Sequence, residues 1–268
     1  MPELPEVEGM RRRLAHLIVG RAIADVEDVS GTATRSCGPV PFREGVVGRR
    51  FTGTDRRAKN LLLCLDSGDT IVMHFMREGM LEVAPRDAER AKHTQAVMRL
   101  DNGNELRLRD TMRAARWTLC AGGDFSGVSS LQKLGPEFTD EGFSPEYLKK
   151  ALNRKAPLKS LLVDQKVLSG VGNAYAHEIA WEAKIRPDRI GNSLTDYEVG
   201  RLYDAVHSVF ERAIAAREAS ALDIMGDEGW EVARIHRRKG QPCPECGAQI
   251  LGEKLGGNLI YYCPECQR

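Results

Sequence analysis

The chain has 268 residues, of which 42% are hydrophobic and 29% charged, a composition typical of a globular protein with room for two modest domains. No apolar run is long enough to span a bilayer, which excludes membrane-spanning proteins and leaves no expected membrane partner. The formal net charge of +1 excludes a uniformly basic nucleic-acid binder, although Lys and Arg are clustered locally, as in residues 11–13 and 234–239.

The chain begins with the sequence MPELPE. Because residue 2 is small, we expect Met1 to be removed, which leaves Pro2 with a free secondary amine. An α-amino group titrates near pH 8, so an appreciable fraction is unprotonated and nucleophilic at neutral pH. Glu3 follows directly and Glu6 comes one helical turn later. A nucleophile beside carboxyl groups is the arrangement used in covalent catalysis.

A structural interpretation of the same residues stays open. Proline and glutamate are both favoured in the first turn of a helix, so the motif is also typical of a plain helix start. The apolar stripe of that helix would consist of Val7, Met10, Leu14, Leu17 and Ile18.

Acidic residues near the N-terminus argue against a secretory signal peptide, so we expect a cytoplasmic protein, associated with the nucleoid in a bacterium. In that reducing compartment the seven cysteines are not expected to form disulfides. Cys37, Cys64 and Cys120 are scattered singly along the chain. No apolar stripe beyond the needs of a core is evident, and we expect a monomer.

Residues 20–120 have the pattern of strands separated by turn signals. The segments that we expect to form neighbouring strands of hairpins are 60–65, 70–74, 96–100 and 105–109. Their regular spacing predicts a β-sandwich or a barrel. A segment that begins rich in Gly and Ser, residues 121–136, would connect it to a helical second part.

From residue 144 the pattern becomes helical, and we expect helices over 144–152, 156–165, 173–184 and 195–217. Ser144 would cap the first of them, and Thr195 with Glu198 would form a capping box at the last.

The sequence LSGVGN, residues 168–173, lies between the second and the third of these helices. Its two glycines allow a tight turn, and the helix that begins at Asn173 would offer backbone N–H groups to an anion such as a DNA phosphate. A plain helical hairpin is the alternative.

The four remaining cysteines form two C-x2-C pairs with the spacing of a zinc ribbon: Cys243, Cys246, Cys263 and Cys266. Four thiolates complete the tetrahedral coordination of zinc, so one Zn²⁺ would be structural and not catalytic. A redox function of the pairs is the alternative, which the presence of two pairs at this separation disfavours. Residues 252–258 would form the tip of a hairpin, and nothing implies an organic cofactor.

Taken together, these features resemble the formamidopyrimidine-DNA glycosylase / endonuclease VIII family of base-excision repair enzymes. Five motifs carry the resemblance, in order along the whole chain: PELPE at 2–6, RAK at 57–59, LGPE at 134–137, GVGNAYA at 170–176 and RKG at 238–240. The PELPE start is closer to the formamidopyrimidine branch.

The resemblance implies an α+β multidomain fold. Its parts would be an N-terminal catalytic β-sandwich with a leading helix (1–120), a linker (121–136), a helix–two-turn–helix DNA-binding domain (137–235) and a four-cysteine zinc finger (236–268).

The family also implies a bifunctional DNA glycosylase and AP lyase. Pro2 would attack C1′ of the sugar and form an iminium, while Glu3 transfers protons at the sugar ring. Glu6 would support the site, and Lys59 would reach the phosphate of the lesion or assist departure of the base. Collapse of the iminium by β,δ-elimination would nick the strand.

The implied partner is damaged DNA, abasic or lesion-containing and double- or single-stranded. A base inside a duplex must be flipped out, and the backbone must be gripped to hold it there. His74, Lys155 and Asn173 match family positions that contact phosphates around the extruded nucleotide.

Several lesion-reading positions depart from the family pattern. The usual His-Leu-Gly-Met is HFMR at 74–77, so Arg77 stands where a methionine fills the vacated base space. The usual Asp-Pro-Arg-Arg-Phe-Gly is DTMRAA at 110–115, which puts Met112 at the void-filling arginine and Ala114 at the aromatic wedge. Arg113 lies between them, and an alanine cannot separate stacked bases as a phenylalanine can.

Two further departures concern the second half of the chain. Asn258 replaces the arginine usually found in the zinc hairpin, and residues 220–232 are shorter than the lesion-capping loop. We therefore expect an intact lyase with a changed lesion range. A DNA-binding lesion sensor that does not excise bases is the alternative, and a purely structural zinc-ribbon module is the third hypothesis.

Overall fold

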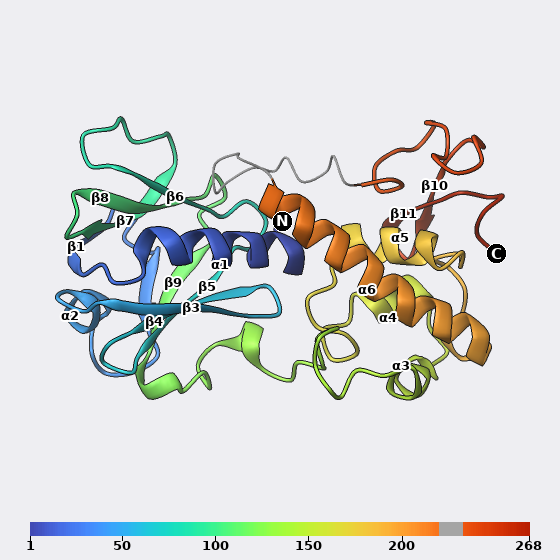
Figure 1. Ribbon diagram of the computed structural model, residues 1–268, viewed down its shortest axis with the longest axis horizontal. Coiled ribbons are helices and arrows are strands. Elements are labelled where there is room, and N and C mark those ends of the chain that lie inside the picture. The colour runs from blue at the N-terminus through green and yellow to red at the C-terminus, as the bar shows by residue number, and fades with distance from the viewer. Residues whose placement is uncertain (220–232) are drawn as a thin grey trace. The chain divides into compact units, whose positions relative to one another are not determined.

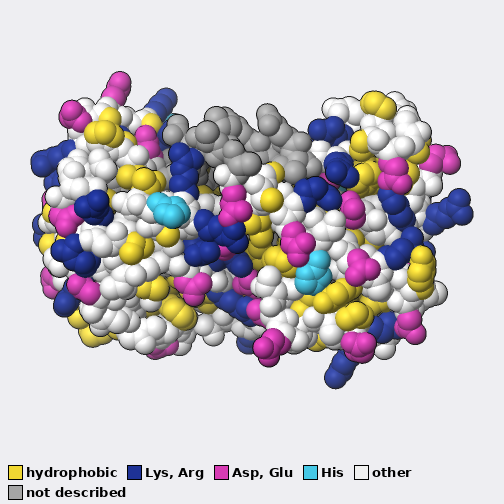
Figure 2. All heavy atoms as spheres, in the orientation of Figure 1, with side chains coloured by type: hydrophobic (Ala, Val, Ile, Leu, Met, Phe, Trp, Pro, Cys, Tyr) yellow, Lys and Arg dark blue, Asp and Glu magenta, His cyan; other side chains and the backbone are white. Residues whose placement is uncertain are grey.

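The computed structural model describes residues 1–219 and 233–268, which divide into two compact units (Figure 1). Unit 1 is built mainly from Met1–Gln132 and unit 2 from Lys133–Arg217 with the residues from 233 onward. Among the helices of these described ranges, none combines the length and the apolar character needed to cross a bilayer. Figure 2 shows Lys and Arg side chains interspersed with Asp and Glu on the visible face, in keeping with a net charge near zero.

Unit 1 begins with helix α1 (Leu4–Ile18) and continues into two β-sheets. One sheet has the strand order β1-β7-β8-β6, and the other has the order β2-β9-β5-β4-β3, in which β2 runs parallel to β9. The strands are β1 Ile23–Asp28, β2 Thr34–Ser36, β3 Phe51–Arg57, β4 Asn60–Leu65, β5 Thr70–His74, β6 Met80–Pro85, β7 Thr94–Leu100, β8 Asn104–Arg109 and β9 Arg116–Cys120. The short segments are α2 Phe42–Val46 and the 3-10 turns η1 Ala121–Gly123 and η2 Ser129–Leu131.

The two sheets and α1 enclose one apolar core, so the predicted N-terminal β-sandwich with a leading helix is confirmed. Figure 1 shows α1 lying across β3 and β4, which it contacts. The expected hairpin partners also pair as antiparallel neighbours, β4 with β5 and β7 with β8. One residue of the predicted stripe is wrong: Leu17 is 37% exposed, because it lies one position away from the buried row that ends at Ile18.

Successive side chains of β4 point to opposite faces of its sheet. Leu61 and Leu63 enter the main core, whereas Leu62 faces a second apolar cluster on the other side. The residues that cover this outer cluster belong to the segment 121–131, which follows β9 directly.

Unit 2 contains the helices α3 (Pro145–Leu152), α4 (Leu158–Leu162), α5 (Asn173–Glu182) and α6 (Asp196–Ala219), the turn η3 (Gly191–Ser193) and the hairpin strands β10 (Leu251–Leu255) and β11 (Asn258–Tyr262). Two predicted helix starts are confirmed. The Ser144 hydroxyl accepts the backbone N–H of Tyr147 at 3.1 Å, and Thr195 and Glu198 exchange hydrogen bonds across the first turn of α6.

Two expectations in unit 2 need correction. The helix expected over 156–165 is shorter, because the chain turns after Leu162 and the Gln165 side-chain amide donates to the carbonyl oxygens of Val163 and Val171. The hairpin tip is also shorter than residues 252–258. Gly256 and Gly257 alone make the turn, with φ of 54° and 83°, while the preceding residues continue β10.

Candidate active site and metal site

The first turn of α1 fixes the acidic residues near the N-terminus. Glu6 Oε2 accepts the backbone N–H of Glu3 at 2.9 Å, which closes the helix start and makes the structural interpretation of the motif correct as well. The Glu3 side chain is buried, and Pro2, next to it, is half-buried. In the full-length chain the Pro2 nitrogen belongs to a peptide bond and becomes an amine when Met1 is removed.

Lys59 comes from the turn between β3 and β4, and Ala58 before it has a φ of 51°. Burial lowers the pKa of the Lys59 ammonium, and the carboxylates of Glu3 and Glu6 oppose this effect by favouring the charged form. The two acids and the lysine therefore lie within electrostatic reach of one another, although they are more than 50 positions apart in the sequence. The structure thus brings together three of the four predicted catalytic residues, with Pro2 covalently attached to one of them.

His74 ends β5 and lies opposite Asn60, the neighbour of Lys59. Its Nδ1 atom accepts the backbone N–H of Met76 at 3.1 Å, so the proton of the neutral ring is on Nε2. Burial lowers the pKa of His74, and the positive charge of Lys59 lowers it further. The Lys59 ammonium group and the neutral Nε2–H donor of His74 lie within electrostatic reach of each other, an arrangement suited to binding an anion.

The predicted lesion-reading residues of unit 1 lie on two adjacent loops. Gly79 closes the loop 75–79, and a Cβ atom there would lie 2.6 Å from Ala115 Cβ, so the two loops are in contact. The Thr111 hydroxyl also donates to the Glu78 carboxylate across them. Arg77 and Arg113 are exposed on these loops.

A buried aspartate shapes the second loop. The Asp110 carboxylate accepts three backbone N–H groups, from Met112 at 2.9 Å and from Ala114 and Ala115 at 2.7 Å each. The loop therefore projects Met112, which is 50% exposed, and holds Arg113 at a φ of 54°. The loops that carry Arg77 and Met112 are thus in contact, and Met76, which precedes Arg77, is 41% exposed.

In unit 2 the two residues predicted to contact phosphates lie at or shortly before helix starts. Asn173 is exposed and is the first residue of α5, and Lys155 is exposed three residues before α4. The buried Lys159 of α4 donates to the backbone carbonyl of Leu259 in β11 at 3.2 Å, which ties this helix to the cysteine hairpin. Asn258 is the first residue of β11 and pairs with Leu255.

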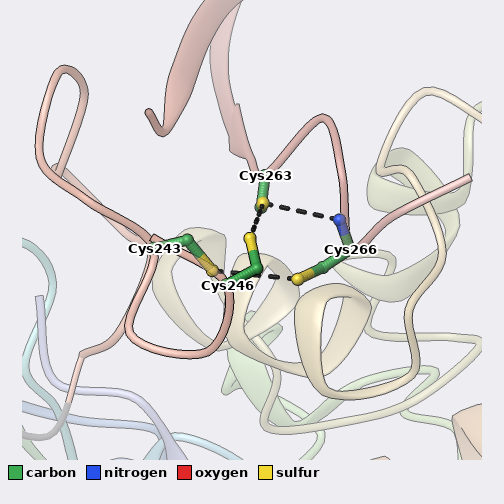
Figure 3. Close-up of side chains that lie close together, drawn as sticks. All are labelled: Cys243, Cys246, Cys263 and Cys266. Carbon is green, nitrogen blue, oxygen red and sulfur yellow. Dashed lines mark hydrogen bonds between the residues drawn. The ribbon is translucent and has the colours of Figure 1, made fainter. Parts of the chain in front are cut away.

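The four cysteine side chains converge on one point beside the C-terminal end of β11 (Figure 3). Their sulfur atoms all lie within 4.8 Å of one another, with Cys243 and Cys266 3.9 Å apart and Cys246 and Cys263 3.4 Å apart. A tetrahedral zinc with bonds of about 2.3 Å needs sulfur separations of about 3.8 Å, so the four thiols fit a structural Zn²⁺.

Comparison with known proteins identifies the chain. The family model of the formamidopyrimidine-DNA glycosylase N-terminal domain matches residues 1–117, and that of the formamidopyrimidine-DNA glycosylase H2TH domain matches residues 134–223. The formamidopyrimidine-DNA glycosylase of Pelotomaculum thermopropionicum is 35% identical over 274 residues, which covers 100% of this chain and 99% of the relative. This chain belongs to the formamidopyrimidine-DNA glycosylase family.

Solved structures of the formamidopyrimidine-DNA glycosylase family agree with this assignment. The MutM (Fpg) protein of Thermus thermophilus has a TM-score of 0.85 at 32% identity, with 99% of this chain and 98% of that chain covered. The Lactococcus lactis Fpg in complex with DNA that contains an abasic site has a TM-score of 0.89 at 28% identity, with 99% of each chain covered. The predicted family and fold class are thereby confirmed.

Three residues of this formamidopyrimidine-DNA glycosylase family member lie near the site without a sequence motif that predicts them there. Glu8 and Arg56 are buried beside the lysine turn, and Met76 occupies the glycine position of the family pattern with a φ of 53°. The signal in the sequence is a methionine where the family pattern has glycine. The segment 220–232, predicted to be a shortened lesion-capping loop, lies outside the described residues.

Proposed function

We propose that this member of the formamidopyrimidine-DNA glycosylase family is a bifunctional DNA glycosylase and AP lyase that repairs damaged DNA in the cytoplasm. The observation that carries the proposal is that the buried Lys59 ammonium lies within electrostatic reach of Glu6 and of the buried Glu3, which directly follows Pro2. A buried ammonium near two carboxylates is more than a helix start requires. The abasic-site DNA bound by the Lactococcus lactis relative supports the same substrate class.

In the proposed reaction the free Pro2 nitrogen donates its electron pair to C1′ of the deoxyribose. The bond from C1′ to the base breaks, and the base leaves with a proton. Glu3 protonates the sugar-ring oxygen, which opens the ring and gives a charged iminium between Pro2 and C1′. The iminium acidifies the neighbouring C2′ proton, and its removal expels the 3′ phosphate. Removal of the C4′ proton from the conjugated product then expels the 5′ phosphate, which completes the nick.

The remaining predicted residues have binding roles in this proposal. Lys59 and the Nε2–H group of His74 contact the phosphates beside the lesion, and Lys155 and Asn173 contact the backbone from unit 2. Glu6 holds the backbone of Glu3 through its 2.9 Å hydrogen bond and so positions the nucleophile. We further propose the domain ranges 1–120, 137–235 and 236–268, joined by the linker 121–136.

We also propose that the lesion range differs from that of relatives with an aromatic wedge. Ala114 is too small to enter the base stack, whereas Met76 and Met112 are exposed apolar side chains on adjacent loops. These two methionines would fill the space of the extruded base, with Arg77 and Arg113 beside them. Such flexible side chains suit lesions that are easily extruded.

Borohydride reduction in the presence of abasic-site DNA tests the chemistry. Reduction converts the iminium into a stable amine, so we expect a covalent protein–DNA adduct and loss of the adduct in Pro2→Gly. Pro41→Gly is a matched control, because Pro41 is an exposed proline of the same unit and its variant should form the adduct normally. Absence of the adduct in the processed wild-type protein would leave a lesion sensor as the better function.

A lesion panel tests the substrate range separately. We expect release of bulky or weakly paired bases at rates close to abasic-site cleavage, and slower release of 8-oxoguanine opposite cytosine. Equal rates on 8-oxoguanine:cytosine duplex and on abasic DNA would contradict the changed lesion range while leaving the lyase chemistry intact.

A further inference from the structure

Two cysteines that are far apart in the sequence meet at one edge of the five-stranded sheet. Cys37 follows β2 directly, and Cys120 is the last residue of β9. The parallel pairing of β2 with β9 ends at Ser36 opposite Leu119, and the Cys37 backbone N–H extends it by donating to the Leu119 carbonyl at 2.9 Å. The Sγ atoms of Cys37 and Cys120 are 3.8 Å apart.

The two thiols have different surroundings. Cys37 is exposed, so a small reagent in solution can reach it. Cys120 is fully buried in the outer cluster with Leu62, Val72 and Val128. Burial, and after it the neighbouring Cys37 thiol, raise the pKa of Cys120 to about 12. The Cys37 thiol is therefore accessible to an oxidant, whereas the neighbouring Cys120 thiol is buried and protonated.

The loop after β9 passes directly beside the exposed thiol. A Cβ atom at Gly127 would lie 2.7 Å from Cys37 Sγ, so only a residue without a side chain allows this approach. The loop holds the Cys37 side chain next to Cys120 and so restricts the rotamers that Cys37 can adopt.

We propose that Cys37 and Cys120 form a reversible redox-modification site, in which a peroxide oxidises Cys37 and Cys120 then closes a disulfide between β2 and β9. Neighbouring strands lie about 4.8 Å apart, within the range of about 4.4 to 6.8 Å between the Cα atoms of bridged cysteines. The bond can therefore form by side-chain rotation, without separation of the strands.

The chemistry balances with hydrogen peroxide as the oxidant. The Cys37 thiolate attacks one peroxide oxygen, the O–O bond breaks, and Cys37 becomes a sulfenic acid while hydroxide leaves. The Cys120 sulfur then attacks the Cys37 sulfur and expels the hydroxyl group, which takes up the proton of Cys120 as water. Two thiols and one peroxide give one disulfide and two waters, and a dithiol reductant reverses the change.

The site is remote from the candidate active site within unit 1. Thr70 pairs with Cys120 at one end of β5, whereas His74 pairs with Arg116 at the other end. We therefore expect the disulfide to fasten the edge strand β2 while the borohydride adduct with abasic DNA still forms. This inference does not depend on the proposed function, because its primary readout is the thiol chemistry of the protein alone.

Peptide mapping after mild peroxide treatment of the zinc-loaded full chain tests the proposal. Trypsin should release residues 36–43 and 117–133, each with one cysteine. We expect these peptides to appear joined and lighter by two hydrogen atoms, and to separate after dithiothreitol. The thermal midpoint of the oxidised protein should lie above that of the reduced protein, since a cross-link restricts the unfolded chain.

Three cysteine variants sharpen the test. Cys64→Ser is the matched control, because Cys64 lies in β4 outside the pair, and the joined peptides should still form. Cys37→Ser and Cys120→Ser should give none, and Cys120→Ser should accumulate a Cys37 sulfenic acid that dimedone traps. Equal dimedone labelling of Cys37 in wild type and Cys120→Ser, or oxidation confined to the four zinc-binding cysteines, would overturn the proposal.

Discussion

Arg56 Nε donates to Glu8 Oε2 at 3.1 Å, and the two side chains are only 10% and 9% exposed. The same guanidinium reaches the carbonyl oxygen of Ala58 through Nη1 at 3.2 Å. Ala58 precedes Lys59, so helix α1 holds the turn that carries the candidate catalytic lysine. One planar guanidinium serves the two acceptors from two separate nitrogen atoms, whereas a lysine at position 56 would have only one nitrogen to offer.

Glu8→Gln should destabilise unit 1. Burial by itself raises the pKa of Glu8, but hydrogen bonds from Arg11, Arg12 and Arg56 outweigh it and lower the pKa from 4.5 to about 2. A depressed carboxyl pKa stabilises the folded state above the unfolded value of 4.5 and ceases to do so as the pH falls toward 2. We expect the substitution to lower the free energy of unfolding by about 3 kcal/mol at pH 7.

Urea unfolding at a series of pH values measures this effect. The difference in the free energy of unfolding between wild type and Glu8→Gln should be constant from pH 8 to pH 5. It should become smaller as the pH falls below 4.5. Glu44→Gln is the control, because Glu44 is exposed on α2 and its loss should change stability by less than about 0.5 kcal/mol. A pH-independent difference would show that the ion cluster is not its source.

His74 should contact DNA through its neutral ring. Asparagine at this position can still accept the Met76 N–H group but offers no donor at the place of Nε2, whereas glutamine can supply that donor. We expect Kd for abasic-site DNA to rise about tenfold in His74→Asn, the loss of one hydrogen bond to a charged group, and to rise less in His74→Gln.

The pH dependence of this contact follows from the same residue. The pKa of His74 is held below 6.5 by burial and by Lys59, so the ring stays neutral from pH 7 to pH 8. The ratio of the wild-type and His74→Asn dissociation constants should therefore be flat over that range. It should grow only in acid, where the protonated ring adds charge to the phosphate contact. A ratio that falls steadily from pH 7 to pH 8 would mean that the charged ring binds.

The cysteine hairpin should depend on its metal. Purified protein should contain about one zinc per chain by elemental analysis, and Cys263→Ser should contain none, because Cys263 is a fully buried member of the cluster. Without zinc the hairpin has too small a core to fold, so amide exchange in β10 and β11 should become fast. Cys37→Ser, a serine substitution outside the cluster, should keep the zinc and slow exchange. Slow exchange in metal-free protein would refute the structural role.

Local patterns explain which parts of this structure were predictable. The sandwich strands, the start of α5 and the metal ligands follow from spacing within short segments, and the sequence alone predicts them. The contact between Cys37 and Cys120 depends on a parallel pairing across 83 positions, which no short pattern encodes. The positive φ of Met76 could not be predicted from the sequence for a similar reason. At a non-glycine residue such a conformation is imposed by the surrounding loop.

Met76 and Met112 should replace the aromatic wedge of the family. Both are exposed apolar side chains, and the packing of Gly79 against Ala115 holds their loops together. Separation of stacked bases costs a few kcal/mol in a duplex and far less in a single strand. We expect the double variant Met76→Ala, Met112→Ala to trap abasic duplex DNA about 10- to 100-fold more slowly, while trapping of the single-stranded form changes by about twofold at most.

The comparison of substrates separates a wedge from a general defect. A misfolded or poorly binding variant would lose both reactions equally, so equal losses on duplex and single-stranded DNA would contradict the wedge role. Val40→Ala serves as the control, because Val40 is an apolar residue of unit 1 that is 49% exposed and lies outside both loops. Restoring one bulky group in Ala114→Phe should speed duplex trapping in the double variant, since a phenylalanine can enter the stack in place of the methionines. If that ring has no effect, the loop 110–115 does not face the base stack, and the wedge role falls to the loop 75–79 alone.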